Sequence, residues 1–204
     1  MANNLFKPDS PLMITMTQIT DAIFLSIFWL VGSIPVVTMG ASFAALYDSS
    51  FRGFRQGEKN TWHRFWDVYR TNWKAGIVPT VVVMALLFAL VKILVRFWNN
   101  AVAGAISWQV FAAVAFVGIV LLGILSVVFP VLSRFENSAM GLLKNALLLA
   151  LANLPRTVGL GFVNAVAIFL CAKLVIPMFF VPSLAALIGS IFVEPMFKPY
   201  LNEE

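Results

Sequence analysis

The sequence predicts an all-α integral membrane protein, a bundle of about five transmembrane helices with additional interfacial amphipathic helices. Three runs of bilayer length carry almost no charge: residues 76–94, 110–132 and 158–192. A run of about 18 apolar residues crosses the hydrocarbon core as a helix, because backbone groups in lipid must hydrogen-bond within their own segment. The composition agrees, with 61% hydrophobic and 11% charged residues, against roughly 25% charged in soluble domains. We expect residues 1–204 to form a single membrane domain.

The net charge of +5 has two readings, nucleic-acid binding and cations gathered on one side of a membrane. In a chain this apolar, cations on the cytoplasmic side facing anionic headgroups explain it better, and no nucleic-acid partner is expected. Cys171 is the single cysteine, so no intramolecular disulfide can form. One cation, Lys7, with Pro8 and Pro11 after it, is unlike the start of a cleaved signal peptide, so the first apolar stretch is expected to be retained.

The first span is expected over residues 18–37, ending near Pro35, with Gly40 as a second flexible point. The alternative is a re-entrant break at these two residues within a longer hairpin. The next segment, 48–74, carries six cations against three acids, which predicts a cytoplasmic location by the positive-inside rule. Its aromatic residues recur at helical spacing and predict an amphipathic helix in the headgroup layer: Trp62, Phe65, Trp66, Tyr69 and Trp73.

The remaining spans follow by alternation across the bilayer, at about 75–95, 108–132, 157–176 and 183–197. The segment 134–156 is expected on the cytoplasmic side, with a short interfacial helix over 138–153. Pro177 and Pro182 bracket a tight outer turn. This arrangement has five spans, the N-terminus outside and the C-terminus in the cytoplasm. Six spans with the N-terminus inside is the competing arrangement.

Three separated stretches carry a family resemblance. They are Ile34-Pro35-Val36-Val37-Thr38-Met39-Gly40 with Ala44-Ala45-Leu46-Tyr47, then Asn72-Trp73-Lys74-Ala75, then Phe129-Pro130-Val131-Leu132-Ser133-Arg134-Phe135-Glu136-Asn137. Together with Phe180-Val181-Pro182-Ser183 and Phe197-Lys198-Pro199-Tyr200, they resemble the YesL-type multi-pass membrane proteins of bacteria. The resemblance implies a place in the bacterial cytoplasmic membrane. It also implies an accessory part in carbohydrate uptake, since such proteins are often encoded beside importers of the ABC class for oligosaccharides, although the family itself has no defined function.

The group Arg134-Phe135-Glu136-Asn137 is the leading candidate for a partner-docking site, because it lies where a predicted span meets the cytoplasm. A structural reading competes, with Arg134 on lipid phosphate and Glu136-Asn137 capping the next helix, worth about 0.3–1 kcal/mol. Glu136 and Leu154-Pro155 also echo the coupling helix of importer permeases, which indicates an importer permease or ATPase subunit as a partner. The further docking candidates are Lys144, Asn145, Asn72 and Lys74.

Ionisable residues within spans are candidate functional residues, because burying a charge in lipid costs several kcal/mol. The intramembrane polar candidates are Asp21, Lys92, Lys173 and Asn164. The two lysines can extend their stems to the outer interface, and Asp21 is expected to pair with one of them. Asn164 lies near mid-bilayer, where interhelical hydrogen bonding is the ordinary role of an asparagine.

The sequence offers no enzymatic signature. His63 is the single histidine, so we expect no catalytic, metal or cofactor site, and Gly104, Gly123, Gly159 and Gly161 are interpreted as helix-packing positions. The expected function is accessory to oligosaccharide import, with the lipid bilayer and importer subunits as partners and a homo-oligomer as a further option. A small oligomeric channel or transporter is the alternative, but a channel needs polar residues along a full path, and Asn164 stands nearly alone.

Overall fold

The computed structural model describes residues 11–135 and 138–201, and all regular structure in this part of the chain is helical. The helices are α1 (Pro11–Gly32), α2 (Met39–Gln56), α3 (Thr61–Val102), α4 (Trp108–Arg134), α5 (Ala139–Ala152), α6 (Leu154–Lys173) and α7 (Val181–Leu201), with short 3₁₀ helices η2 (Val36–Thr38) and η3 (Ile176–Phe179). Five of them are long and apolar enough to cross a membrane, namely α1, α3, α4, α6 and α7. The prediction of an all-α membrane bundle is confirmed.

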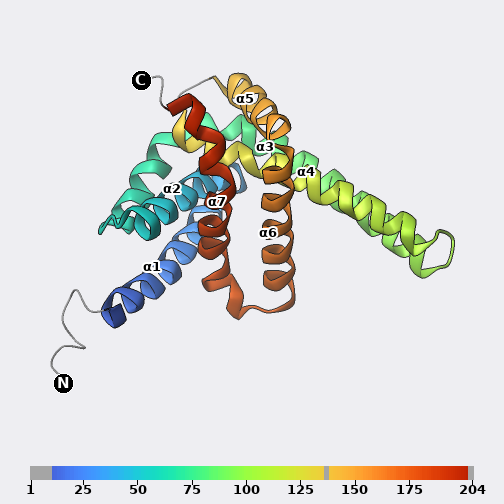
Figure 1. The fold of residues 1–204 in the computed structure, drawn as a ribbon, viewed down its shortest axis with the longest axis horizontal. Helices are drawn as coiled ribbons and strands as arrows, with labels where there is room; N and C mark the ends of the chain where they lie inside the picture. Colours follow the sequence, from blue (N-terminus) through green and yellow to red (C-terminus); the bar gives the residue numbers. More distant parts are fainter. Residues whose placement is uncertain (1–10, 136–137, 202–204) are drawn as a thin grey trace.

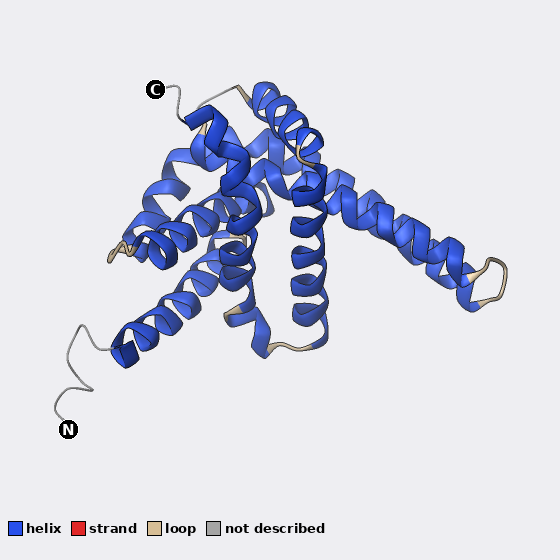
Figure 2. Ribbon diagram, in the orientation of Figure 1, coloured by secondary structure: helices blue, strands red, loops and turns tan. Residues whose placement is uncertain are grey.

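The helices spread from a shared base (Figure 1). Three arms leave it in different directions: α1, the pair α6–α7, and the hairpin of α3 and α4, which extends farthest. The connections between helices are short loops (Figure 2). The base contains α2, α5, the first part of α3 and the last turns of α4 and α7, and it holds most of the buried side chains.

Helix α2 lies at the centre of the base and packs against α1, α3, α4 and α7. It is rich in small residues, including Gly40, Ala41, Ser42, Ala44 and Ala45, all buried. Small side chains allow helix backbones to approach closely in membrane proteins. The sequence-based assignment differed here, since the expected first span ran to residue 37 whereas α1 ends at Gly32, and a separate helix follows after Pro35.

The aromatic row of the segment 48–74 is helical, as expected, but it is not a separate interfacial helix, because it continues into the span predicted at 75–95 as one helix, α3. The first part of the segment belongs to α2, which ends at Gln56 and is followed by Gly57 with φ at +72°, and the second part is the start of α3. The aromatic row does not face headgroups as a unit, because Phe65 is fully buried against Leu25 and Leu46. Helices α1 and α2 supply the apolar surface that these rings cover, and this packing was invisible to periodicity alone.

The tip of the α3–α4 hairpin carries three aromatic rings in mutual contact. Trp98 lies 5.5 Å from Trp108 and 5.4 Å from Phe111, measured between ring centroids. Amphipathic aromatic residues collect at membrane–water interfaces, so the tip has the composition of an interfacial anchor. The connecting loop contains Gly104 at φ +73° with open space around it. The interpretation of Gly104 as a packing residue is therefore wrong, because the position serves a turn.

Helices α4 and α6 pack with their backbones in contact at two glycines. A Cβ added to Gly123 would collide with the carbonyl of Thr157, and one added to Gly161 would collide with the carbonyl of Ile119. Here the packing interpretation is confirmed. The close approach sets the relative position of two membrane-crossing helices and thereby the shape of the space beside them.

Candidate functional site

The base contains a charged cluster built around Asp48, whose side chain is fully buried. Its carboxylate accepts a hydrogen bond from Arg52 Nε at 3.2 Å and one from Arg64 Nε at 2.6 Å. The Nε of Arg134 lies 3.6 Å from the same carboxylate. Three helices, α2, α3 and α4, therefore send an arginine to one acid.

Arg134 links this acid to a second one on α7. Its Nη2 donates to Glu194 Oε1 at 2.9 Å, and the hydroxyl of Tyr47 donates to the same oxygen at 2.9 Å. The guanidinium also lies over the ring of Phe51, with Cζ 4.9 Å from the centroid, a favourable cation–π arrangement. The side chain of Arg134 is 12% exposed, so its charge is held by protein groups rather than by water.

The cluster contains three arginines and two acids, and a buried charge is tolerated when it is paired and hydrogen-bonded. Burial raises the pKa of the Tyr47 phenol well above its usual range, and the neighbouring Glu194 carboxylate raises it further. The phenol therefore stays protonated and donates its hydrogen bond to Glu194. We call this cluster of ion pairs and hydrogen bonds the charged brace, because it joins α2, α3, α4 and α7 in a fixed arrangement.

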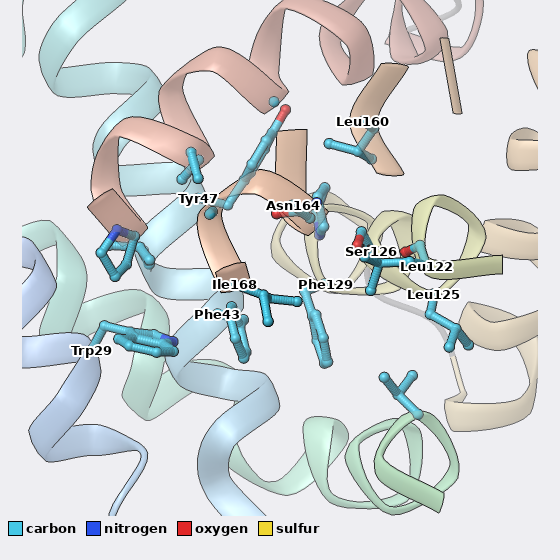
Figure 3. Close-up of a pocket in the computed structure, with 18 of the residues that line it drawn as sticks. Trp29, Phe43, Tyr47, Leu122, Leu125, Ser126, Phe129, Leu160, Asn164 and Ile168 are labelled. Atoms are coloured by element: carbon cyan, nitrogen blue, oxygen red, sulfur yellow. Dashed lines mark hydrogen bonds between the residues drawn. The ribbon is translucent and has the colours of Figure 1, made fainter. Parts of the chain in front are cut away.

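An apolar cavity of about 220 Å³ lies beside this cluster, lined by residues of α1, α2, α3, α4, α6 and α7 (Figure 3). Tyr47 belongs to both, because its ring lines the cavity and its hydroxyl reaches Glu194. Aromatic side chains form part of the wall: Trp29, Phe43 and Phe129. A cavity with this lining has the composition of a site for lipophilic molecules.

Few polar groups reach the cavity. Ser126 lines it and donates its hydroxyl hydrogen to the Leu122 carbonyl at 2.7 Å. The side chain of Asn164 projects into its central part (Figure 3), and no hydrogen bond joins it to another residue within the described ranges. The interhelical hydrogen bond expected of Asn164 is thus not formed there, and its amide faces the cavity instead.

The candidate docking residues separate into two groups. Arg134 belongs to the charged cluster and is 12% exposed. Its guanidinium therefore does not bind lipid phosphate, as one interpretation expected, and little of its surface is accessible to a partner. Phe135 packs on Phe197, with ring centroids 5.5 Å apart, and Phe135 and Asn72 line a second surface hollow between α3, α4 and α5. Lys74, with its ammonium 5.4 Å from the Trp73 ring centroid, and Lys144 and Asn145 on α5 are exposed. Glu136 and Asn137 lie outside the described residues.

The intramembrane candidates are not brought together. Asp21 on α1 lies near the side chain of Thr61, at the start of α3. Among the ion pairs of the described residues, none joins Asp21 to a lysine, so the expected pairing is wrong. Lys92 lies over the Phe88 ring at 5.3 Å, and Lys173 is exposed in the last turn of α6.

The functional residues that sequence reasoning missed are Asp48, Tyr47 and Glu194 as one unit. In the sequence, Asp48 stands at the start of a polar segment and has the look of a loop acid, because the residues after it are mostly polar. A signal existed in Ala44-Ala45-Leu46-Tyr47-Asp48, where small and apolar residues precede the acid and indicate a packed helix face. Glu194 is 60 residues from Arg134 and 147 residues from Tyr47 in the sequence. Contacts across such separations cannot be recognised from a local sequence pattern.

The fold and site define a multi-pass α-helical membrane protein, with a charged brace at its base and an apolar cavity beside it. Residues 22–92 match the model of a family described as a protein of unknown function, DUF624. The matched stretch contains Asp48, Arg52 and Arg64, whereas Arg134 and Glu194 lie outside it. No curated protein and no solved structure matches the chain.

Proposed function

We propose that this protein is an accessory subunit of an oligosaccharide importer in the bacterial cytoplasmic membrane, which binds its partner through the outer face of α5. YesL-type proteins are in the matched family, and the resemblance to them supplies the importer as the partner class. The protein would contribute binding and positioning, while the partner would carry out transport.

The observation that carries this proposal is an apolar stripe on α5. One face of this helix is buried, with Leu142 and Ala146 fully enclosed. The opposite face exposes large apolar side chains at helical spacing: Met140, Leu147, Leu148 and Leu151, with Lys144 between them. Helix α5 is too short to be a span, and such a stripe is the form in which a helix enters an apolar groove of a partner.

The distribution of cations supports a cytoplasmic position for this stripe. Ten of the 13 cations in the described residues lie in the base, which contains α5, or at the start of α6: Arg52, Arg55, Lys59, Arg64, Arg70, Lys74, Arg134, Lys144, Arg156 and Lys198. The other three, Lys92, Arg96 and Lys173, lie toward the opposite ends of α3 and α6. Lysine and arginine accumulate on the cytoplasmic side of membrane proteins.

The cavity lining supports the accessory role over a channel. A pore needs polar groups or charges along its path, whereas the residues around this cavity are nearly all apolar, with Asn164 and Ser126 as scattered exceptions. Sugar or ion passage along this lining would leave a polar solute without hydrogen-bonding partners.

Affinity purification from native membranes in mild detergent tests the proposal. We expect an importer permease or ATPase subunit to co-purify with the wild type and to be lost from the double variant Leu148→Ser/Leu151→Ser. The matched control is Leu86→Ser/Leu121→Ser, which changes equally exposed leucines on α3 and α4 and should retain the subunit. Equal recovery with both variants, or recovery of the protein alone as a homo-oligomer, would refute the proposal.

Single-cysteine labelling tests the side of the membrane, because Cys171 is the one cysteine to remove. In a Cys171→Ser background, we expect Met140→Cys to react with a membrane-impermeant maleimide in inverted vesicles and to be silent in right-side-out vesicles. Labelling from the outside would reverse the orientation. Silence from both sides would mean that the stripe faces lipid, which would remove the docking surface.

A further inference from the structure

We propose that the cavity lined by α1, α2, α3, α4, α6 and α7 binds a neutral carbonyl-bearing ring lipid of the isoprenoid quinone class, with its carbonyl at Asn164 and its tail along α6. The proposal does not depend on the accessory role, since it concerns the membrane interior rather than α5. It rests on the size, chemistry and opening of one cavity.

The cavity has the length of a lipid tail. Its lining on α6 runs from Leu160 to Cys171, and eleven residue steps at about 1.5 Å each give about 16 Å. This is close to half of the roughly 30 Å hydrocarbon core. Leu160 lies at the end near Tyr47, and Cys171 and Pro182 lie toward the turn between α6 and α7.

The cavity is open on one side rather than closed. Ile168 lines it and is 56% exposed. A molecule dissolved in the bilayer can therefore enter from the side, while its tail remains in contact with lipid. The reservoir for the occupant is the membrane itself.

The polar group of the occupant must be uncharged and able to accept a hydrogen bond. The residues that line the cavity include no Asp, Glu, Lys or Arg, so a charged headgroup would find no counter-charge in a medium where it needs one. Asn164 presents an amide that lacks a hydrogen-bonding partner among the described residues. The Asn164 side chain is partly buried, so a ligand carbonyl at this point gains one neutral hydrogen bond.

The cavity wall favours a flat ring beside that carbonyl. The rings of Phe43 and Phe129 are stacked, with centroids 5.1 Å apart and planes at 15°. Trp29 meets Phe43 edge-on at 5.1 Å. These three rings come from α1, α2 and α4 and form one continuous aromatic wall, on which a planar ring gains the same stacking interactions. A saturated acyl chain has neither a planar ring to stack on this wall nor an acceptor for the Asn164 amide.

Tryptophan quenching provides the test, because quinones quench indole fluorescence and Trp29 lies in the wall. Menaquinone-4 and decylubiquinone are titrated into the purified full-length protein in detergent. We expect saturable quenching that is lost in Trp29→Phe. Asn164→Leu should weaken Kd about two- to tenfold, the value of one neutral hydrogen bond, and Asn99→Leu, at the exposed hairpin tip, should leave Kd unchanged.

A steric pair of variants on α6 gives a second readout. Ala167→Phe fills the cavity and should abolish binding, whereas Ala172→Phe places the same ring on the exposed surface and should bind normally. Mass spectrometry of lipids that co-purify from native membranes should detect a quinone in the wild type and Ala172→Phe, and none in Ala167→Phe. Non-saturable quenching, equal affinity in Asn164→Leu, or co-purified phospholipid in place of quinone would overturn the proposal.

Discussion

Replacement of Asp48 by asparagine is the sharpest perturbation of the base. The substitution keeps the volume of the side chain and removes the charge that Arg52, Arg64 and Arg134 share. Because the Asp48 side chain is fully buried, solvent cannot replace what is lost. Glu194 remains as the one acid of the cluster.

The magnitude follows from the exposure of the arginines. Arg52 and Arg64 are 30% and 32% exposed, so water can hydrate them, and each lost pair should cost at most about 1 kcal/mol. Arg134, at 12% exposure, loses one of two counter-charges in a buried setting, where an unpaired charge costs about 3–5 kcal/mol. Since Glu194 still pairs with Arg134, we expect Asp48→Asn to reduce the free energy of unfolding by about 3 kcal/mol.

The assay is reversible unfolding in mixed micelles with increasing sodium dodecyl sulfate, followed by tryptophan fluorescence and far-ultraviolet circular dichroism. The matched control is Asp67→Asn, an exposed acid on α3, which should shift stability by less than about 0.5 kcal/mol. Adding Arg134→Gln to Asp48→Asn should cost less than the sum of the two single changes, because the two residues share one cluster. If Asp48→Asn and Asp67→Asn unfold alike, the buried brace does not exist.

Three further changes test other parts of the structure in the same unfolding assay. Gly123→Ala should destabilise by about 1–3 kcal/mol because the methyl group forces α4 and α6 apart, whereas Gly118→Ala should cost less, since its methyl meets flexible leucine side chains; equal costs would contradict the backbone contact. Tyr47→Phe should cost about 0.5–1.5 kcal/mol through the lost hydrogen bond to Glu194, and an unchanged stability would show that this bond contributes nothing. Gly57→Ala should destabilise by about 1–2 kcal/mol, because alanine is strained at positive φ, and a neutral result would argue against the left-handed cap.

The membrane class and the helical architecture were predictable because both depend on local composition. An apolar run of bilayer length must be helical whatever its neighbours are, so α4, α6 and the apolar part of α3 were anticipated from their own residues, but the continuity of α3 from Thr61 to Val102 was not. Pro35 similarly indicated a break after α1, although the first span was expected to run to residue 37 and Gly40 lies within α2. Glycines at 123 and 161 suggested close packing, although the sequence could not say which helices they join.

The sequence by itself thus determined that this chain is a helical membrane protein, and only the tertiary structure decided where its polar residues go. From the sequence, Asp48 resembles a charged residue of a loop, but in the structure α3 and α4 bring Arg64 and Arg134 to it. Asn164 resembles a residue that hydrogen-bonds between helices, but in the structure it lines the cavity. The physical reason is the distance along the chain over which each interaction acts. Helix formation in lipid is set by each segment's own hydrogen bonds, whereas ion pairing and cavities depend on distances between segments, which local composition does not specify.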